Sequence, residues 1–247
     1  MKRSKASQIL AGVLVNAFYE MKNYPVVLLS TVLSPLSFLL LVVFVSRGTL
    51  IGEAVIGGFI LTMFQSGMSL QSDLAHLKND FKLQDMIVAS PTNWLTYIVG
   101  LVIGDIVYSL PALIVLTILA YYFLALSIIG TLGLIAVLLL MFLVSMVIGY
   151  ALSTYSSDIV QSFAFSRLLA TLFSTIPPVY YPITFIPLPY RYLAYLSPTT
   201  YAAELAQSAA GFVSPPLTSI ILDWVILVAV TVALFIVAAT KARWREV

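Results

Sequence analysis

The chain has 247 residues, of which 61% are hydrophobic and 9% are charged, and its mean hydropathy is +1.06. Soluble domains contain about 45 to 50% apolar and about 25% charged residues, so this composition excludes a soluble globular protein and predicts an integral membrane protein. The absence of cysteine excludes disulfides, thiolate metal sites and a cysteine nucleophile. Because the net charge is only +2, the positions of the charges are more informative than their sum.

The start of the chain predicts an amphipathic elbow helix over residues 5–22 that lies on the membrane surface. Apolar residues from Ile9 to Met21 fall on one helical face, while Gln8, Asn16 and Glu20 fall on the other. A basic start before an apolar run also fits a signal peptide. Asn16 and Glu20 interrupt that run, however, and no small-residue cleavage site follows it.

Long segments without charge predict an all-α membrane protein with six transmembrane helices. A helix needs about 20 apolar residues to cross about 30 Å of hydrocarbon. The segment from Ile106 to Ser157 carries no charge and is long enough for two crossings, so the GTLG sequence at Gly130–Gly133 predicts a turn within it. The predicted spans are residues 26–46, 54–72, 94–123, 128–155, 159–185 and 218–240 of a single domain that covers residues 1–247.

Residues 174–211 are as apolar as a span, yet they contain six prolines and six tyrosines. Proline removes a backbone donor, so these residues cannot form one straight transmembrane helix, and tyrosine favours the boundary between lipid and water. We expect the fifth span to lose its helix at the Pro-Pro pair and an outer re-entrant helical hairpin to follow over residues 186–214. Pro198 and Gly211 bound a predicted short helix over residues 199–210.

The basic residues predict the orientation, because short cytoplasmic loops are enriched in lysine and arginine. If the N-terminus is cytoplasmic, only Arg47 and Arg191 lie outside, and six spans also return the C-terminus to the cytoplasm. We therefore expect a multi-pass protein of the plasma membrane whose proline- and tyrosine-rich segment faces outward. The basic residues assigned to the cytoplasmic side are Lys2, Arg3, Lys5, Lys22, Lys78, Lys82, Arg167, Lys241, Arg243 and Arg245.

The one long polar segment lies between the second and third spans, at residues 73–90. Leu74, Leu77 and Phe81 recur there at helical spacing, which predicts a short amphipathic helix suited to a groove on another protein. A solvated connector is the alternative. His76, the sole histidine, has no nucleophile or carboxylate cluster around it in sequence, so it makes no catalytic constellation.

Three stretches of the sequence carry motifs that resemble those of a known protein family. The first is LLSTVLSPLSFLLLVVF around Pro35, which follows the predicted elbow helix. The second is FKLQDMIVASPTNWLTYIVGLVIG at residues 81–104, and the third covers residues 167–207. Together they resemble a permease subunit of the ABC-2 family of ATP-driven exporters, and the likeness covers essentially the whole chain.

The third stretch is similar to the family's C-terminal phrase P-L-T-Y-x-x-E-x-x-R. Pro198, Tyr201 and Glu204 match that phrase, whereas Thr199 replaces its leucine and Gln207 replaces its arginine. In the second stretch, the family often has glycine where this chain has a lysine, at position 82.

The resemblance implies a transporter of two permeases, in a homodimer or heterodimer, and two ATP-binding subunits. Residues 73–90 would be the coupling helix, and ATP and Mg would bind to the partner subunit, with no nucleic acid involved. This chain lacks the G-x-x-x-x-G-K-[ST] loop that cradles phosphates, so it is not expected to be an ATPase by itself. The residues expected to contact the ATPase are Leu74, Leu77, Lys78, Phe81, Lys82 and Asp85.

Polar residues inside the predicted spans are candidates for function. Asp105 and Arg167 enter their spans to similar depths, which predicts either an ion pair or two charges that snorkel independently to the headgroups. Gly100 and Gly104 form a G-x-x-x-G motif, for which we favour close packing. A polar helical stripe in the second span lines the translocation path or packs against neighbouring helices, and it consists of Thr62, Gln65, Ser69 and Ser72.

The outward-facing segment is the candidate outer gate. Its tyrosines either contact substrate or anchor the gate at the membrane surface, and Glu204 is either a gate residue or a solvated carboxylate. The residues assigned to the gate are Pro177, Pro178, Tyr180, Tyr181, Pro198, Tyr201 and Glu204.

Two other functions compete with the exporter interpretation. An intramembrane lipid-modifying enzyme needs convergent acids, bases or metal ligands, and only Asp105 and Arg167 lie that deep. An ion-coupled secondary transporter is favoured by internal repeats, and residues 1–123 and 124–247 show none. Neither a catalytic residue nor a metal site is therefore predicted.

Overall fold

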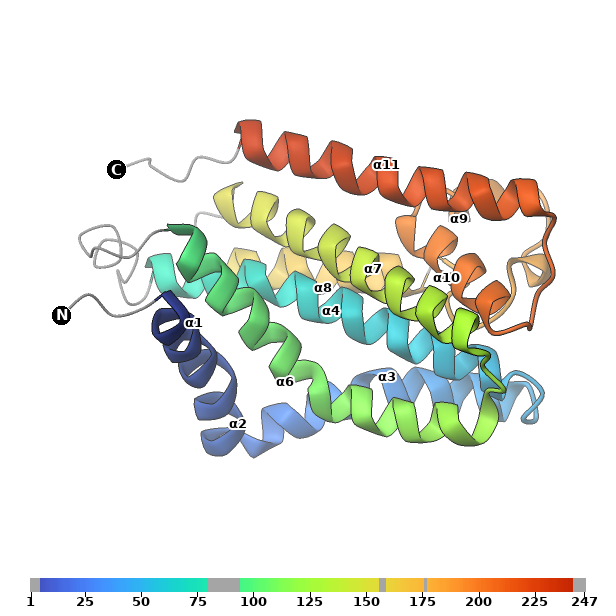
Figure 1. Cartoon of the computed structure of the whole chain (residues 1–247), viewed down its shortest axis with the longest axis horizontal. Coiled ribbons are helices and arrows are strands. Elements are labelled where there is room, and N and C mark those ends of the chain that lie inside the picture. The colour runs from blue at the N-terminus through green and yellow to red at the C-terminus, as the bar shows by residue number, and fades with distance from the viewer. Residues whose placement is uncertain (1–4, 80–93, 156–158, 176, 242–247) are drawn as a thin grey trace.

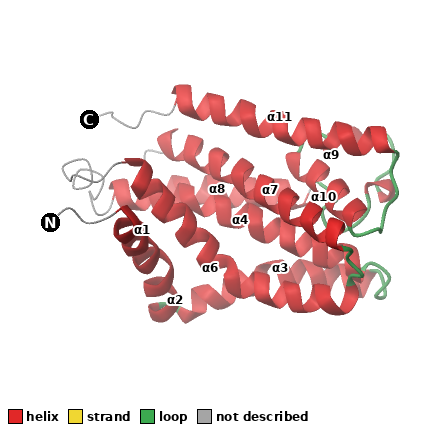
Figure 2. Ribbon diagram, in the orientation of Figure 1, coloured by secondary structure: helices red, strands yellow, loops and turns green. Residues whose placement is uncertain are grey.

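The computed structural model describes residues 5–79, 94–155, 159–175 and 177–241. These residues form helices and loops, with no β-strand among them (Figure 2). The helices, in chain order, are α1 (Lys5–Val13), the π-helical η1 (Leu14–Tyr19), α2 (Glu20–Asn23), α3 (Pro25–Val45), α4 (Ile51–Asn79), α6 (Trp94–Phe123), α7 (Ile128–Tyr155), α8 (Ile159–Thr175), the 3-10 turn η2 (Ile183–Phe185), α9 (Arg191–Ala194), α10 (Pro198–Ala209) and α11 (Leu217–Lys241).

Five of the described helices are long and apolar enough to cross a membrane. Helix α8 is not one of these five. It contains a shorter apolar segment, Ala164–Phe173, and packs against α4 and α7. The five long apolar segments are Leu28–Val45 in α3, Ile51–Gln71 in α4, Val99–Phe123 in α6, Ile128–Ser153 in α7 and Leu217–Val237 in α11.

Helix α4 is the centre of the bundle. Within its segment Ile51–Gln71, 89% of the residues are buried, and α3, α6, α7 and α8 all pack against it. Helix α1 and the C-terminal end of α11 lie at one end of the bundle, and α9 and α10 lie at the other (Figure 1). We call these the α1 end and the α10 end.

Small residues let α4 and α7 approach closely. A Cβ atom on Gly67 of α4 would lie 2.6 Å from the carbonyl oxygen of Phe142, and one on Gly149 of α7 would lie 3.1 Å from the carbonyl oxygen of Gly67. A methyl group at Gly67 would force its neighbours to shift, and one at Gly149 would be tight, so the two backbones lie close together, as is common where membrane helices cross.

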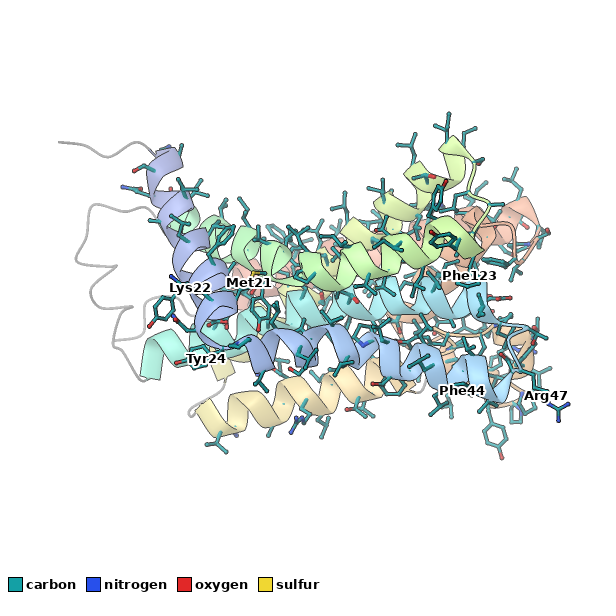
Figure 3. The ribbon with its side chains drawn as sticks, turned by 90° about the horizontal axis from the view of Figure 1, so that it is seen from below. Met21, Lys22, Tyr24, Phe44, Arg47 and Phe123 are labelled. Carbon is teal, nitrogen blue, oxygen red and sulfur yellow. The ribbon has the colours of Figure 1, made fainter. Side chains whose placement is uncertain are left out.

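The first helices form one continuous helical segment from Lys5 to Asn23, which covers the predicted elbow helix. Val13 and Ala17 are buried, whereas Leu10, Leu14 and Phe18 on the same predicted face are exposed. Helix α1 packs against α6. Figure 3 shows Met21, Lys22 and Tyr24 where this segment meets α3, with Arg47 at the opposite end of the bundle.

The predicted turn at Gly130–Gly133 is wrong, although α6 and α7 have the bounds expected for the third and fourth spans. The turn is at residues 124–127, and the Ser127 hydroxyl accepts a hydrogen bond of 3.0 Å from the Gly130 N–H, which caps the start of α7. Gly130 lies against the carbonyl of Ala209, and Gly133 lies near the Ala209 side chain. The two glycines therefore make room for the end of α10.

Two helix ends also differ from the predicted spans. Helix α8 ends at Thr175, ten residues before the predicted end of the fifth span at residue 185, because two consecutive prolines follow and cannot continue a helix. Helix α4 continues to Asn79, so residues 73–79 of the predicted coupling segment extend this helix. Residues 80–90 of that segment lie outside the described residues.

Candidate functional site

A polar cavity of about 260 Å³ lies between α3, α4 and α6. Every lining side chain carries a hydroxyl, an amide or a carboxyl group, which is unusual for helices whose sequences are otherwise apolar. The lining residues are Ser30, Thr31 and Ser34 from α3, Thr62, Gln65, Ser66 and Ser69 from α4, and Asp105, Tyr108 and Ser109 from α6.

The structure places three members of the predicted polar stripe on this cavity, namely Thr62, Gln65 and Ser69. The side chain of Ser72 lies outside the described residues. Gln65 donates a hydrogen bond of 3.2 Å from its side-chain amide to the hydroxyl of Ser34, which joins α4 to α3. The stripe therefore packs against a neighbouring helix and borders a cavity, and its place on a translocation path stays a prediction.

A second hydrogen bond joins α4 to α6 at the same place. The Ser66 hydroxyl donates to the backbone carbonyl of Asp105 over 2.9 Å, and both residues are buried. The hydroxyls of Thr62 and Ser109 donate to carbonyl oxygens of their own helices, at Gly58 and Ile106. Each of these hydroxyl groups donates its proton to a backbone carbonyl. Only the lone pairs of the hydroxyl oxygens therefore remain to accept hydrogen bonds.

Asp105 is the one carboxylate on the cavity wall, and it is 7% exposed. Its Oδ2 atom is buried and has no hydrogen-bond partner among the residues that the structure describes. The same side chain is within hydrogen-bonding reach of Asp73 and Ser69 on α4, and it lies in the field of Glu20 on α2. Acids on α4 and α2 therefore act on the Asp105 side chain of α6.

The structure does not bring Asp105 and Arg167 together. Arg167 is exposed on α8, and the charged groups that act on Asp105 among the described residues are Asp73 and Glu20. Gly100 of the predicted G-x-x-x-G motif packs against α1, where a Cβ atom on Gly12 would lie 3.3 Å from the Gly100 Cα atom. Gly104 is buried in α6.

The coupling residues are described only in part. Leu74, Leu77 and Lys78 belong to the last turns of α4, and their side chains are outside the described part of the chain. Phe81, Lys82 and Asp85 lie outside it altogether.

The predicted gate residues converge at the α10 end. Pro177, Pro178, Pro198 and Tyr180 are buried, and Tyr180 stacks on Phe38 of α3 with ring centroids 5.8 Å apart. Burial raises the pKa values of Tyr180 and of Tyr181, which is half-buried. These residues pack the connection between α8 and α10 against the bundle.

Helix α10 itself is held by buried polar contacts. The Ser197 hydroxyl accepts a hydrogen bond from the Thr199 N–H and so caps the helix. Gln207, 1% exposed, donates from its side-chain amide to the carbonyl oxygen of Tyr181 over 3.3 Å. The position where the family phrase has arginine therefore holds a neutral residue that joins α10 to the segment after α8.

Glu204 lies on the partly exposed side of α10. The Tyr195 hydroxyl donates to its carboxylate over 3.5 Å, and the Tyr201 hydroxyl donates to the Tyr195 carbonyl over 2.8 Å. Burial and the negative charge of Asp223 raise the pKa of Glu204 to about 7. Burial and the neighbouring acids raise the pKa of Tyr195 to about 12, so Tyr195 remains a neutral donor across the physiological range.

Comparison of the sequence with models of known protein families adds a further observation. Residues 10–210 match the family model described as ABC-2 type transporter. This chain belongs to the ABC-2 type transporter family. No curated protein matches the chain.

Membership in the ABC-2 family indicates what kind of protein contains these helices and this cavity. The chain is a permease component of an ABC transporter and a multi-pass membrane protein, not itself catalytic, and the family associates with ATP-binding subunits. The match covers α3, α4 and α6, which line the polar cavity, and it reaches the end of α10.

Sequence reasoning missed most of the cavity wall. The signal was present, because Ser30 and Ser34 are four residues apart, and Asp105, Tyr108 and Ser109 have i, i+3, i+4 spacing on one helical face. Asp73 was missed as a partner of Asp105, since only the packing of α4 against α6 brings the two acids together.

Proposed function

We propose that this chain is the permease subunit of an ATP-driven exporter, in which it forms the translocation path for the substrate. The observation that carries this proposal is the family match over residues 10–210, which includes every helix that lines the polar cavity. A water-accessible polar surface among apolar crossing helices is what a translocation path requires, since polar groups are costly to expose to lipid.

The proposed topology has six crossings, with both termini in the cytoplasm of a plasma-membrane protein. Helix α8 is the sixth crossing, and its position beside α4 and α7 supports it. The α1 end is then cytoplasmic and the α10 end external, in agreement with the distribution of lysine and arginine. In this orientation, the helical segment from Lys5 to Asn23 is the interfacial elbow.

Coupling to the ATPase is proposed at residues 73–90. The described part of this segment, residues 73–79, forms the last turns of α4 at the α1 end, on the cytoplasmic side in the proposed topology, where a nucleotide-binding subunit can reach it. Two such subunits, each binding ATP and Mg, and a second permease complete the transporter. The proposed contact residues are Leu74, Leu77, Lys78, Phe81, Lys82 and Asp85.

The proposed outer gate is the segment from Pro177 to Glu204 at the α10 end. Its contacts with α3, α7 and α11 support a role in closing the exit, because movement of these helices has to move α10 as well. Outward release then follows when closure of the ATPase dimer rocks the two permeases.

The proposal is tested by co-purification of the full-length chain from membranes of its own cells. An ATP-binding subunit with a phosphate-binding loop should co-purify, and Leu77→Asp in the coupling segment should abolish this. Leu196→Asp, the same change at an 80% exposed leucine at the α10 end, should not. Transport driven by an ion gradient without any ATPase subunit would overturn the proposal.

A further inference from the structure

The cavity between α3, α4 and α6 has a chemical preference of its own. Its wall combines hydroxyl oxygens with a carboxylate, and none of the lining residues that the structure describes carries a positive charge. We propose that this cavity is a binding site for a small organic cation with a protonated primary amine.

The first argument is the unsatisfied acceptor. Asp105 is buried, and within the described part of the chain its Oδ2 atom has no hydrogen-bond partner. An unpaired buried carboxylate oxygen is costly, and a donor supplied by a ligand removes that cost. The Tyr108 hydroxyl, which faces Thr31 without completing a hydrogen bond of ordinary geometry, is buried on the same wall.

The second argument is the direction of the hydroxyl groups. Thr62, Ser66 and Ser109 donate their protons to backbone carbonyls, so they face the cavity as acceptors. Ser34 already accepts a hydrogen bond from Gln65. A primary ammonium group carries three N–H donors and no acceptor, so it can donate to these hydroxyl oxygens and to the carboxyl group of Asp105.

The third argument is the local charge. Among the described residues, the charged groups that act on Asp105 are Asp73 and Glu20, while Arg167 is exposed on α8 and Lys22 is exposed on α2. Opposite charge within a low-dielectric site is strongly attractive, so a cation is favoured and an anion is repelled. The same acids disfavour a phospholipid headgroup, whose phosphate would accompany its amine into the cavity.

Size and access fit a small ligand. A cavity of about 260 Å³ lies below the range of about 300 to 1,000 Å³ that is typical of drug-sized sites. Ser30 at the rim is exposed, which leaves a route into the cavity. Asp73 lies just beyond Gln71, where the apolar part of α4 ends, so the charged part of the cavity is near the α1 end.

The test measures equilibrium binding to the full-length chain in nanodiscs of phosphatidylcholine, a lipid without primary amines. The probe is n-butylammonium at pH 7, and the readout is a saturable rise in the thermal unfolding midpoint, because a ligand that binds only the folded state stabilises it. Tetramethylammonium has the same charge but no N–H donor, and sodium chloride is the inorganic comparison. The expected result is saturable binding of n-butylammonium alone.

Variants place the binding in the cavity. Asp105→Asn should raise the dissociation constant at least about tenfold, because it removes the carboxyl group that the ammonium would contact, and Thr62→Val should raise it about threefold. Asp223→Asn is the matched control, since Asp223 is equally buried at 7% exposure but lies on α11, away from the cavity. If the Asp105→Asn variant does not fold, the dissociation constants of the Thr62→Val and Ser109→Ala variants test the same prediction.

Three outcomes overturn the inference. They are equal binding of tetramethylammonium, equal binding of sodium, and unchanged affinity in the cavity variants. That the bound amine is also the exported substrate rests on the proposed function, whereas its binding is measured without any ATPase. ATP-driven transport without ammonium binding would overturn this inference alone, and binding without ATP-driven transport would overturn the proposed function alone.

Discussion

The Thr199 hydroxyl, at the start of α10, donates a hydrogen bond of 3.0 Å to the carbonyl of Phe173, in the last turn of α8. The last carbonyls of a helix have no partner within that helix, so this contact satisfies one that would otherwise be lost. The family phrase has leucine at this position, and leucine cannot make the bond. In this chain, α10 and the end of α8 are joined by a residue that departs from the family pattern.

We therefore expect Thr199→Val to destabilise the protein. The change preserves shape but leaves the Phe173 carbonyl without its donor, at a cost of about 1 to 3 kcal/mol, or a fall of about 2 to 10 °C in the unfolding midpoint. Tryptophan fluorescence during thermal unfolding in detergent measures it. The control is Thr117→Val, which removes an exposed bond within α6 to the Leu113 carbonyl, and an equal fall there would refute the interhelical role.

Gly67→Ala should disrupt the contact between α4 and α7. The added Cβ would lie 2.6 Å from the Phe142 carbonyl oxygen, so the helices must separate, at a cost of about 1 to 3 kcal/mol for overpacking. Gly133→Ala is the matched control, because its Cβ would lie 3.5 Å from that of Ala209, an ordinary contact. Thermal unfolding midpoints of both variants check this, and similar midpoints would contradict the packing argument.

The elements predicted well are those with strong local signals. The bounds of α6 and α7 follow from a long segment without charge, and α10 follows from Ser197 and Pro198 at its start and Gly211 after its end. The i, i+3, i+7 spacing of Thr62, Gln65 and Ser69 identified one wall of the cavity. In each case, a local rule and the tertiary structure agree.

The failures arise where tertiary packing decides. Gly130 and Gly133 have the composition of a turn, but they are needed where α10 approaches α7, and the real turn at residues 124–127 contains neither glycine nor proline. Depth alone predicted either that Asp105 pairs with Arg167 or that the two charges lie apart, and depth says nothing about which face of a helix a residue occupies. Its position on the α4 face of α6 directs it to Asp73 instead.

Arg191 should stabilise the loop before α9. Its guanidinium donates to the carbonyl of Ile186 through Nε and Nη2 and to that of Thr184 through Nη2, over 3.1 to 3.3 Å. A lysine cannot reproduce this fork, so Arg191→Lys should lower the unfolding midpoint by a few degrees, corresponding to about 1 kcal/mol. Arg167→Lys, at an exposed position of α8, is the control and should leave the midpoint unchanged. A larger fall for Arg167→Lys than for Arg191→Lys would contradict the stabilising role given to Arg191.

Glu204 should make stability depend on pH. Its pKa is raised by burial and by Asp223 from an ordinary value of 4.5 to about 7, so the folded state holds a proton that the unfolded chain has already lost. The stability that Glu204 contributes is therefore fully present below pH 4.5 and is lost as pH rises to about 7, with no further loss above it. Unfolding midpoints between pH 4 and 9 should fall across this window, and Glu204→Gln should make that fall smaller.

Asp223→Asn separates the two causes of the raised pKa. Without the charge of Asp223, burial alone acts to raise the pKa of Glu204, so the fall in the unfolding midpoint should end at a lower pH than in the unmodified chain. Tyr195→Phe should have the opposite effect, because the Tyr195 hydroxyl donates to the Glu204 carboxylate and so favours its charged form. If all three variants keep the original pH profile, another group titrates in this window and the role assigned to Glu204 is wrong.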